Sequence, residues 1–195
     1  MTELELYIDF ASPASYLALR PTLALIEKLK MQPLEVQWRP FKTTQHAMPE
    51  EKDNETRGET HKRIREIARR DMHLMYAEML KTPMRFRAVP GSCDLALAAL
   101  LYTQPQPLPF IQAAYEAYWV EQLDLNDPRV VAGLLKNNGY DEVAFDAEKY
   151  LGEMASAQSH FIEAGIVDAP GFVVQEHIFI GREHLPWITE LLQVD

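Results

Sequence analysis

The chain has 195 residues, of which 47% are hydrophobic and 25% charged, a composition typical of a soluble globular protein large enough to need no disulfides. Its 29 acidic and 19 basic residues give a net charge of −10, which argues against nucleic acid as the main ligand because phosphate binding needs a concentrated positive surface. Neither a signal-peptide pattern nor a run of roughly 20 apolar residues is present. We therefore expect a cytoplasmic protein that binds neither nucleic acid nor a membrane.

The one cysteine, Cys93, excludes an intrachain disulfide and any dithiol exchange chemistry. Its neighbours in sequence are mostly leucine and alanine, so we expect a small buried hydrophobic residue. The six histidines show neither the H-x-x-x-H nor the H-E-x-x-H spacing that presents two metal ligands on one helix face. We therefore expect no metal site.

The N-terminal part has the pattern of a β-α-β unit. The run "LELYIDF" at Leu4–Phe10 is typical of a strand. Ser12 is a good N-cap and the proline after it suits the first helical position, so a helix is predicted from there to about Lys30. Pro21 lies inside this helix and is predicted to bend it or to split off its first turn. A second strand is predicted at Leu34–Trp38.

The middle of the chain, from about residue 60 to residue 160, is predicted to be mostly helical. A polar segment, Thr43–Glu59, precedes it and is predicted to be a loop. In "HKRIREIARR" at His61–Arg70, we expect Ile64 and Ile67 to face inward and the basic residues to form a solvated face. The methionines that follow could fill the core or line an adaptable apolar pocket. Further helices are predicted at Cys93–Tyr102, Phe110–Val120, 127–137 and Asp146–Ala164.

The C-terminal part returns to β structure. The runs "GFVV" and "IFI" on either side of Gln175–His177 are predicted to form a hairpin, and Glu183–Leu192 a short amphipathic helix. A β-α-β unit followed, after a helical block, by β-β-α is the order of a thioredoxin-type fold. The predicted fold class is therefore α/β, a thioredoxin-like fold with a large all-helical insertion. Its domain limits are 1–42 and 163–195 for the thioredoxin-like domain and 43–162 for the helical insertion.

The helix start at Ser12–Ser15 ("SPAS") occupies the position of the C-x-x-C motif of thioredoxin-type oxidoreductases, where the helix N-terminus lowers a thiol's pKa. A serine hydroxyl cannot exchange disulfides, but Ser12 can donate a hydrogen bond to the thiolate of another molecule. Alternatively, Ser12 is a plain N-cap. Ser15 is expected to be structural.

The second element of the site is Ala169-Pro170, directly before the C-terminal hairpin. In thioredoxin-like folds a cis-proline lies there and faces the active site. It leaves the backbone N–H and C=O of the preceding residue free to pair with a peptide-like ligand. We therefore predict a cis bond before Pro170.

Four runs resemble the 2-hydroxychromene-2-carboxylate isomerases and, equally, the kappa-class glutathione transferases, both in the DsbA-like branch of the thioredoxin superfamily. These runs are "YIDFASPASYLAL", "WRPF", "AYWVEQLDLNDPRVV" and "EAGIVDAPGFVVQEHIFIGREHL". The resemblance covers nearly the whole chain and implies a DsbA-like fold, glutathione as the cofactor, a small aromatic or conjugated electrophile as the substrate, and a homodimer. We favour a glutathione-dependent isomerase. The alternatives are a kappa-type glutathione transferase and a non-catalytic DsbA-like peptide-binding module.

The resemblance also implies roles for single residues. Ser12 is then the catalytic residue, which hydrogen-bonds the sulfur of glutathione and keeps it as a thiolate. The backbone of Ala169-Pro170 pairs with the cysteinyl unit. Arg182 and Glu183 lie in the "GREH" run, where the family places an acid that receives the α-amino group of glutathione. Asn54 is a further glutathione-binding candidate, although the proline of the family's Asn-x-Pro is absent.

Three residues are candidates for substrate binding. Trp38 and Arg39 could supply an aromatic wall and a cation for a substrate carboxylate. An equal alternative is that Trp38 packs at a sheet end and Arg39 forms a surface ion pair. Tyr16 follows the "SPAS" turn and is expected either to line the substrate cleft or to be half-buried packing.

Overall fold

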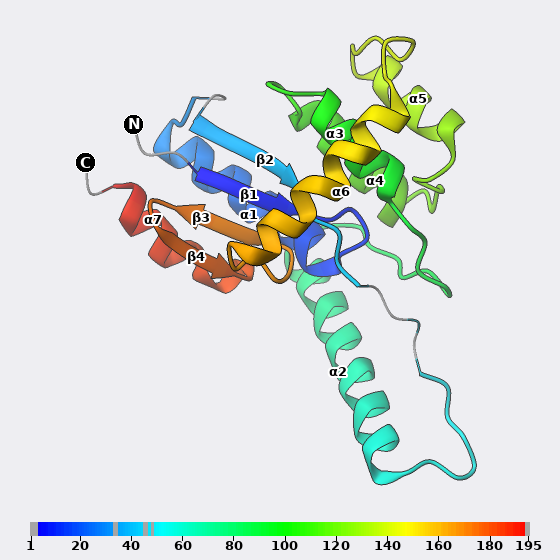
Figure 1. The fold of residues 1–195 in the computed structure, drawn as a ribbon. Coiled ribbons are helices and arrows are strands. Elements are labelled where there is room, and N and C mark those ends of the chain that lie inside the picture. Colours follow the sequence, from blue (N-terminus) through cyan, green and yellow to red (C-terminus); the bar gives the residue numbers. More distant parts are fainter. Residues whose placement is uncertain (1–3, 33–34, 45–46, 48, 194–195) are drawn as a thin grey trace.

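The computed structural model describes residues 4–32, 35–44, 47 and 49–193. A four-stranded sheet with the strand order β2-β1-β3-β4 forms its centre (Figure 1). β1 pairs in parallel with β2 and antiparallel with β3, and β3 pairs antiparallel with β4. The strands are β1 (Leu4–Ile8), β2 (Val36–Pro40), β3 (Gly171–Val174) and β4 (His177–Ile180).

The parallel β-α-β unit and the C-terminal hairpin agree with the sequence prediction. Two limits of β2 differ from it. Pro40 is the last residue of the strand, which is compatible with an edge strand because an edge position does not need every backbone N–H. Leu34, the predicted start, lies outside the described residues.

Helix α1 (Pro13–Leu29) follows β1, and its start and end have clear local causes. The Oγ of Ser12 accepts a hydrogen bond from the N–H of Ser15 at 3.2 Å, as an N-cap does. The helix ends at Lys30, whose left-handed backbone has a φ of 54°. Pro21 lies inside α1 without splitting it, so of the two predicted outcomes, a bend or a split, the split does not occur. The buried face of α1 packs on both sides of Pro21, which holds the helix together despite one missing N–H.

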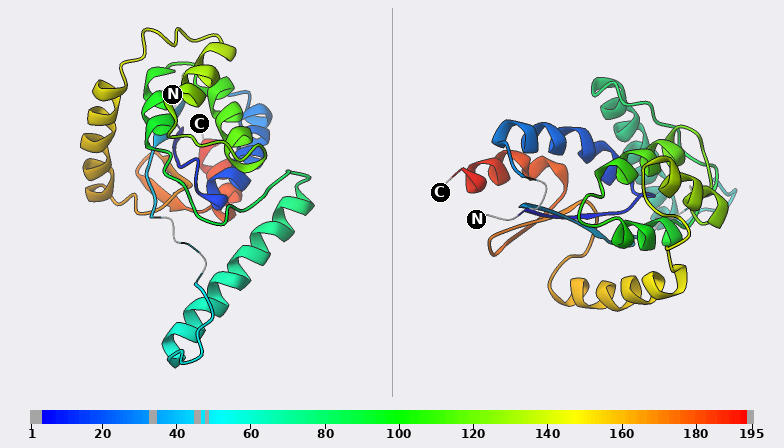
Figure 2. Two further views of the ribbon diagram at one scale, coloured as in Figure 1. Left: turned by 90° about the vertical axis from the view of Figure 1, so that its right-hand side faces the viewer. Right: turned by 90° about the horizontal axis from the view of Figure 1, so that it is seen from above.

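Two layers of helices cover the sheet. Helices α1 and α7 (Leu185–Leu192) lie on one face and α6 (Ala147–Glu163) lies on the other (Figure 2). A short 3₁₀ turn, η2 (Arg182–His184), precedes α7. The remaining helices precede α6 in sequence and follow β2: α2 (Arg57–Met79), α3 (Asp94–Tyr102), α4 (Leu108–Trp119) and α5 (Pro128–Asn137). The chain therefore has the predicted DsbA-like thioredoxin fold, whereas the exact domain limits stay a prediction. Within the described residues, no helix is both long and apolar enough to cross a membrane.

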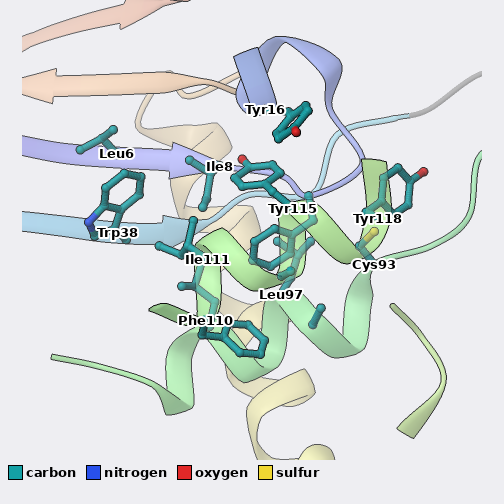
Figure 3. Close-up of a cluster of buried hydrophobic side chains, with 14 of the residues drawn as sticks. Leu6, Ile8, Tyr16, Trp38, Cys93, Leu97, Phe110, Ile111, Tyr115 and Tyr118 are labelled. Carbon is teal, nitrogen blue, oxygen red and sulfur yellow. The ribbon is translucent and has the colours of Figure 1, made fainter. Parts of the chain in front are cut away.

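One continuous core joins the end of the sheet to the helical block. Leu6 and Ile8 of β1 and Trp38 of β2 belong to the same buried cluster as side chains of α3 and α4 (Figure 3). The indole N–H of Trp119 donates to the carbonyl of Phe10 at 2.9 Å, which satisfies this buried polar group. The carboxyl end of β1 is thus held by packing against α3 and α4 and by the hydrogen bond from Trp119.

Cys93 belongs to this core and is 3% exposed, as predicted. Burial is the main cause that raises the pKa of its thiol well above the usual value, and the negative charge of Asp9 adds to it. Because the thiolate is the reactive form, Cys93 is an inert packing residue.

Helix α2 has its apolar side turned outward, contrary to the expectation from the sequence. It extends away from the body of the protein (Figures 1 and 2). Ile64 is 54% exposed and Ile67 is 39% exposed, while Met79 is 73% exposed. Near the C-terminal end of the helix, Ala77 is buried. Apolar spacing identifies a helix face, but it does not say on which side the rest of the chain lies, and here the polar side faces the protein.

Candidate functional site

Ser12 lies in the turn between β1 and α1 and is 4% exposed. Besides capping α1, its Oγ donates a hydrogen bond of 3.0 Å to the carbonyl oxygen of Ala169. A plain N-cap would need only the bond from the Ser15 N–H. The hydroxyl therefore also links the start of α1 to the segment before the C-terminal hairpin. Ser15 is buried, and its Oγ accepts from the N–H of Asp9 at 3.4 Å, which agrees with a structural role.

The peptide bond between Ala169 and Pro170 is cis, as predicted. Both polar backbone groups of Ala169 have partners within the chain. Its carbonyl accepts from Ser12 at 3.0 Å, and its N–H donates to the Oδ1 of Asp168 at 2.8 Å. A peptide-like ligand that pairs with the N–H of Ala169 therefore has to replace the bond to Asp168, whereas the carbonyl has a second lone pair that can accept a further hydrogen bond.

Asp9, the third residue before Ser12, is a buried carboxylate that the sequence analysis missed. Its Oδ1 accepts from the Ala11 N–H at 2.9 Å, and its Oδ2 accepts from the N–H and the hydroxyl of Thr43 at 2.9 and 2.6 Å. Burial raises the pKa of the Asp9 carboxyl, and the hydrogen bonds from Thr43 and Ala11 partly oppose this shift. Asp9 thus joins the turn that carries Ser12 to the segment that follows β2.

Ser12 and Ala169 line a cavity of about 770 Å³, a size suited to a small-molecule ligand. The β1–α1 turn, the segment 41–44 after β2 and the segment 167–169 before the hairpin form one part of its wall. Residues of α2 and α6, the segment before α3 and the end of α4 form the rest. Large apolar side chains line part of it: Phe41, Met72, Phe86, Tyr118 and Trp119. The helical block therefore forms an aromatic cleft over the Ser12 turn.

Basic side chains predominate among the charged residues of the cavity, which are Lys42, Arg69, Arg70, His73 and Arg87 against Glu66 and Asp168. The guanidinium of Arg70 lies 4.7 Å from the ring centre of Phe86, and that of Arg87 lies 4.3 Å from the ring centre of Tyr118. Among the described residues, neither arginine has a carboxylate within ion-pair distance. The Arg87 guanidinium donates a hydrogen bond to the backbone carbonyl of Leu123, whereas Arg70 has no such protein acceptor among the described residues. Arg70 is therefore the arginine that remains available to an anionic ligand.

Within the described part of the chain, His73 is the one histidine on the cavity wall. Its pKa is lowered by burial and, to a smaller extent, by the positive charges of Arg69 and Arg182. The imidazole is therefore mostly neutral at pH 7 and adds little to the positive charge of the cavity.

The three substrate-binding candidates lie outside the lining of this cavity. Tyr16 is 8% exposed, donates its hydroxyl proton to the carbonyl of Pro83 at 2.8 Å and stacks on Trp119. Trp38 is buried in the core, and Arg39 lies 3.9 Å from Glu5 and bonds to the Gln37 side chain. These residues pack the fold or pair at its surface, and the aromatic and cationic wall comes from the helical block instead.

The candidates for the γ-glutamyl end of glutathione are also outside the cavity lining. Asn54 is exposed in the turn before α2. The guanidinium of Arg182 lies 4.2 Å from the ring centre of Tyr76. The exposed Glu183 folds back onto Gly181, close enough that a Cβ at Gly181 would clash with its carboxylate. Pro170 is buried beside Ala169. Of the predicted site residues, the structure brings together Ser12 and the Ala169-Pro170 pair.

No group of three or more His, Cys, Asp and Glu side chains that could hold a metal ion occurs in the described part of the chain. The groups that line the cavity include the Ser12 hydroxyl, backbone N–H and C=O groups, aromatic rings, basic side chains, the His73 imidazole and the carboxylates of Glu66 and Asp168. Such a site can stabilise an anion beside Ser12 and hold a flat anionic ligand next to it.

Comparison with known proteins gives the chain relatives over its whole length. It is 25% identical over 194 residues to the 2-hydroxychromene-2-carboxylate isomerase of Sphingobium xenophagum, and the match covers 97% of each chain. The solved structure of a 2-hydroxychromene-2-carboxylate isomerase superimposes with a TM-score of 0.69 at 15% identity, covering 96% of this chain and 92% of that one. The cytosolic disulfide reductase DsbM of Pseudomonas aeruginosa, solved with GSH, has a TM-score of 0.63 at 16% identity, with 97% and 95% coverage.

The two structural matches have low sequence identity and establish the fold alone. The match in sequence confirms the resemblance to the 2-hydroxychromene-2-carboxylate isomerases. The DSBA-like thioredoxin domain matches residues 3–193, which is nearly the complete chain. The protein therefore belongs to the family of DSBA-like thioredoxin domains.

Proposed function

We propose that the protein is a glutathione-dependent isomerase of the 2-hydroxychromene-2-carboxylate isomerase type, in which Ser12 stabilises the thiolate of glutathione. The observation that carries this proposal is the buried Ser12 hydroxyl, which stands at the N-terminus of α1, contacts Ala169 and lines the cavity. Two relatives support it: the isomerase from Sphingobium xenophagum and the disulfide reductase whose structure contains GSH.

The donor set of the cavity fits glutathione. Ser12 and the backbone of Ala169 suit a cysteinyl unit, because a hydroxyl, an N–H and a C=O match its sulfur, carbonyl and amide. Glutathione also carries two carboxylates, for which Arg87 and Lys42 are cations of the cavity wall, and Arg70 is then left for the substrate. Its amino group would need an acid of the cavity wall; Glu66 lies there, and it would have to leave its ion pair with Arg69, which is 2.9 Å away.

Ser12 and the start of α1 are suited to lowering the pKa of a thiol. When bound, glutathione supplies a sulfur nucleophile that can add to a conjugated double bond and later leave it. The Ser12 hydroxyl would turn from the Ala169 carbonyl to this sulfur, exchanging a neutral hydrogen bond worth about 1 kcal/mol for a charge-assisted one worth about 1.5–3 kcal/mol. The helix N-terminus adds about 0.3–1 kcal/mol. Since about 1.4 kcal/mol equals one pKa unit, a thiol with an ordinary pKa of about 8.5 would reach roughly neutral pH.

The proposed substrate is a small aromatic or conjugated electrophile that carries an acid group. Trp119 and Phe86 would border its ring, and Arg70 would bind its carboxylate. The aromatic side chains of the cavity would also exclude water while the glutathione sulfur is bonded to the substrate. A cytoplasmic location and a homodimer belong to this proposal as well.

The direct test is the isomerisation of 2-hydroxychromene-2-carboxylate, followed by absorbance with and without glutathione. The proposal expects isomerisation that requires glutathione and leaves its concentration unchanged. Consumption of glutathione with release of an adduct would instead establish a kappa-type transferase. Isomerisation at the uncatalysed rate together with no consumption of glutathione contradicts both enzymes for this class of substrate.

A peptide-binding module without turnover is the second candidate. The observation in its favour is that Asn54 and Glu183 lie outside the cavity lining, whereas Ala169, the residue before Pro170, belongs to it. A cysteine-containing peptide that binds more tightly than glutathione, with no reaction of any conjugated acid, would favour this candidate.

A further inference from the structure

The side chain of Asp168 accepts a hydrogen bond from the backbone N–H of Ala169, the group with which a peptide-like ligand would pair. Its Oδ1 accepts the N–H of Ala169 at 2.8 Å, while Ala169 itself is 2% exposed. Asp168 is exposed and lines the cavity. Among the described residues, no cation lies within ion-pair distance of its carboxylate. A carboxylate without a cationic partner thus lies beside the Ser12 turn and accepts the N–H with which, in the proposed function, a cysteinyl ligand would pair.

We propose that Asp168 is a specificity-determining residue, an internal competitor that holds the Ala169 N–H until the carbonyl group of a cysteinyl ligand displaces it. This inference rests on the proposed function, in which glutathione is that ligand. The N–H has one proton, so the carboxylate and a ligand carbonyl cannot both accept it in full. A carboxylate is the stronger acceptor of the two, and therefore ligands without further contacts in the cavity are excluded.

The ligand can displace the Asp168 carboxylate reversibly, because this side chain is exposed to solvent. When Asp168 releases the N–H, its carboxylate returns to water, and no buried charge is left without a partner. The carbonyl of Ala169 is exchanged in the same event, since Ser12 leaves it for the ligand sulfur and the ligand N–H can take its place. Asp168 and Ser12 thus hold the two backbone groups of Ala169 in the ligand-free protein.

Two variants separate the hydrogen bond of Asp168 from its charge. Asp168→Ala removes both, whereas Asp168→Asn keeps an acceptor oxygen without the charge. The dissociation constants of glutathione and of N-acetylcysteine methylamide are measured by calorimetry for both variants and the wild type. We expect Asp168→Ala to bind both probes about tenfold more tightly, the factor that one lost hydrogen bond of about 1.4 kcal/mol gives. Asp168→Asn should lie between it and the wild type. Unchanged or weaker binding of both probes to Asp168→Ala overturns the proposal.

A second readout needs no ligand. In protein labelled with ¹⁵N, the amide proton resonance of Ala169 should lie downfield because of its carboxylate acceptor. It should move upfield in Asp168→Ala and less so in Asp168→Asn. A resonance that stays in place in Asp168→Ala overturns the proposal.

Failure of the proposed function has a different pattern of results. In that case glutathione binds neither the wild type nor Asp168→Ala, while N-acetylcysteine methylamide still binds Asp168→Ala more tightly than the wild type. If neither probe binds Asp168→Ala, the competition itself is contradicted.

Discussion

The Oγ of Ser12 donates a hydrogen bond of 3.0 Å to the carbonyl oxygen of Ala169, a residue 157 positions further along the chain. This contact brings the start of α1 and the cis-proline segment to one end of the sheet. It uses the only proton of the Ser12 hydroxyl, so a ligand sulfur can be stabilised only when that proton turns away from Ala169. In the ligand-free protein the Ser12 hydroxyl is therefore bonded within the chain, and a ligand sulfur has to replace the Ala169 carbonyl as its acceptor.

Asp9 should make the stability of the protein depend on pH. Burial raises the pKa of its carboxyl in the folded state above the unfolded value of about 3.9. The folded state therefore holds the proton to a higher pH, and the free energy of unfolding falls as the pH rises from about 4 through the folded pKa. Each pKa unit contributes about 1.4 kcal/mol. Urea unfolding between pH 4 and pH 7 should show this loss in the wild type and not in Asp9→Asn. An identical pH profile for both proteins contradicts this prediction.

The outward face of α2 should tolerate polar substitution. Ile64 is 54% exposed, so Ile64→Gln should change the free energy of unfolding by less than about 0.5 kcal/mol. Leu97 is 1% exposed and serves as the buried control, since Leu97→Ala should cost about 2–5 kcal/mol. Both are measured by urea unfolding of the purified variants. A cost above about 2 kcal/mol for Ile64→Gln would show that a partner or another part of the protein buries this face.

Arg70 rather than Arg39 should bind the substrate carboxylate. Arg70 lines the cavity and Arg39 does not. Arg70→Gln should raise the KM for a conjugated aromatic acid about tenfold, because it removes a hydrogen bond to a charged group. The matched variant Arg39→Gln should leave KM within about twofold of the wild type. Both variants are compared by steady-state kinetics at saturating glutathione. A larger rise in KM for Arg39→Gln than for Arg70→Gln would instead assign the substrate carboxylate to Arg39, as the sequence suggested.

Tyr16 should contribute to stability and not to ligand binding. Tyr16→Phe keeps the ring that stacks on Trp119 and removes the hydroxyl that donates to Pro83. The expected cost is about 0.5–1.5 kcal/mol in the free energy of unfolding, with KM values within about twofold of the wild type. A tenfold higher KM at unchanged stability would place Tyr16 in the substrate site after all.

Local chemistry in the sequence was sufficient to predict the elements around Ser12. The N-cap serine and the following proline predict where α1 begins, and the observed helix, Pro13–Leu29, agrees within one residue with the predicted range. The alternating apolar runs before it and at the C-terminus predict β1 and the hairpin. These features depend on neighbours in sequence, so the sequence contains the needed information.

The walls of the cavity depend on contacts between distant segments, and these were not predicted. The basic run at His61–Arg70 was interpreted as a solvated face, although Arg69 and Arg70 line the cavity. The acid in the apolar run "YIDF" was a signal for a buried carboxylate, but its partner Thr43 lies 34 residues further on. Sequence spacing could not show that Asp9 and Thr43 meet.

Glutathione binding by the wild type and by Ser12→Ala, measured by calorimetry from pH 6 to pH 9, decides whether Ser12 stabilises a thiolate. The wild type should bind glutathione and release a proton at neutral pH, because Ser12 and the start of α1 favour the thiolate. Ser12→Ala should release less of that proton and bind more weakly by about tenfold or more. No heat of binding at millimolar glutathione, or equal proton release by both proteins, would contradict Ser12 as a thiolate-stabilising residue.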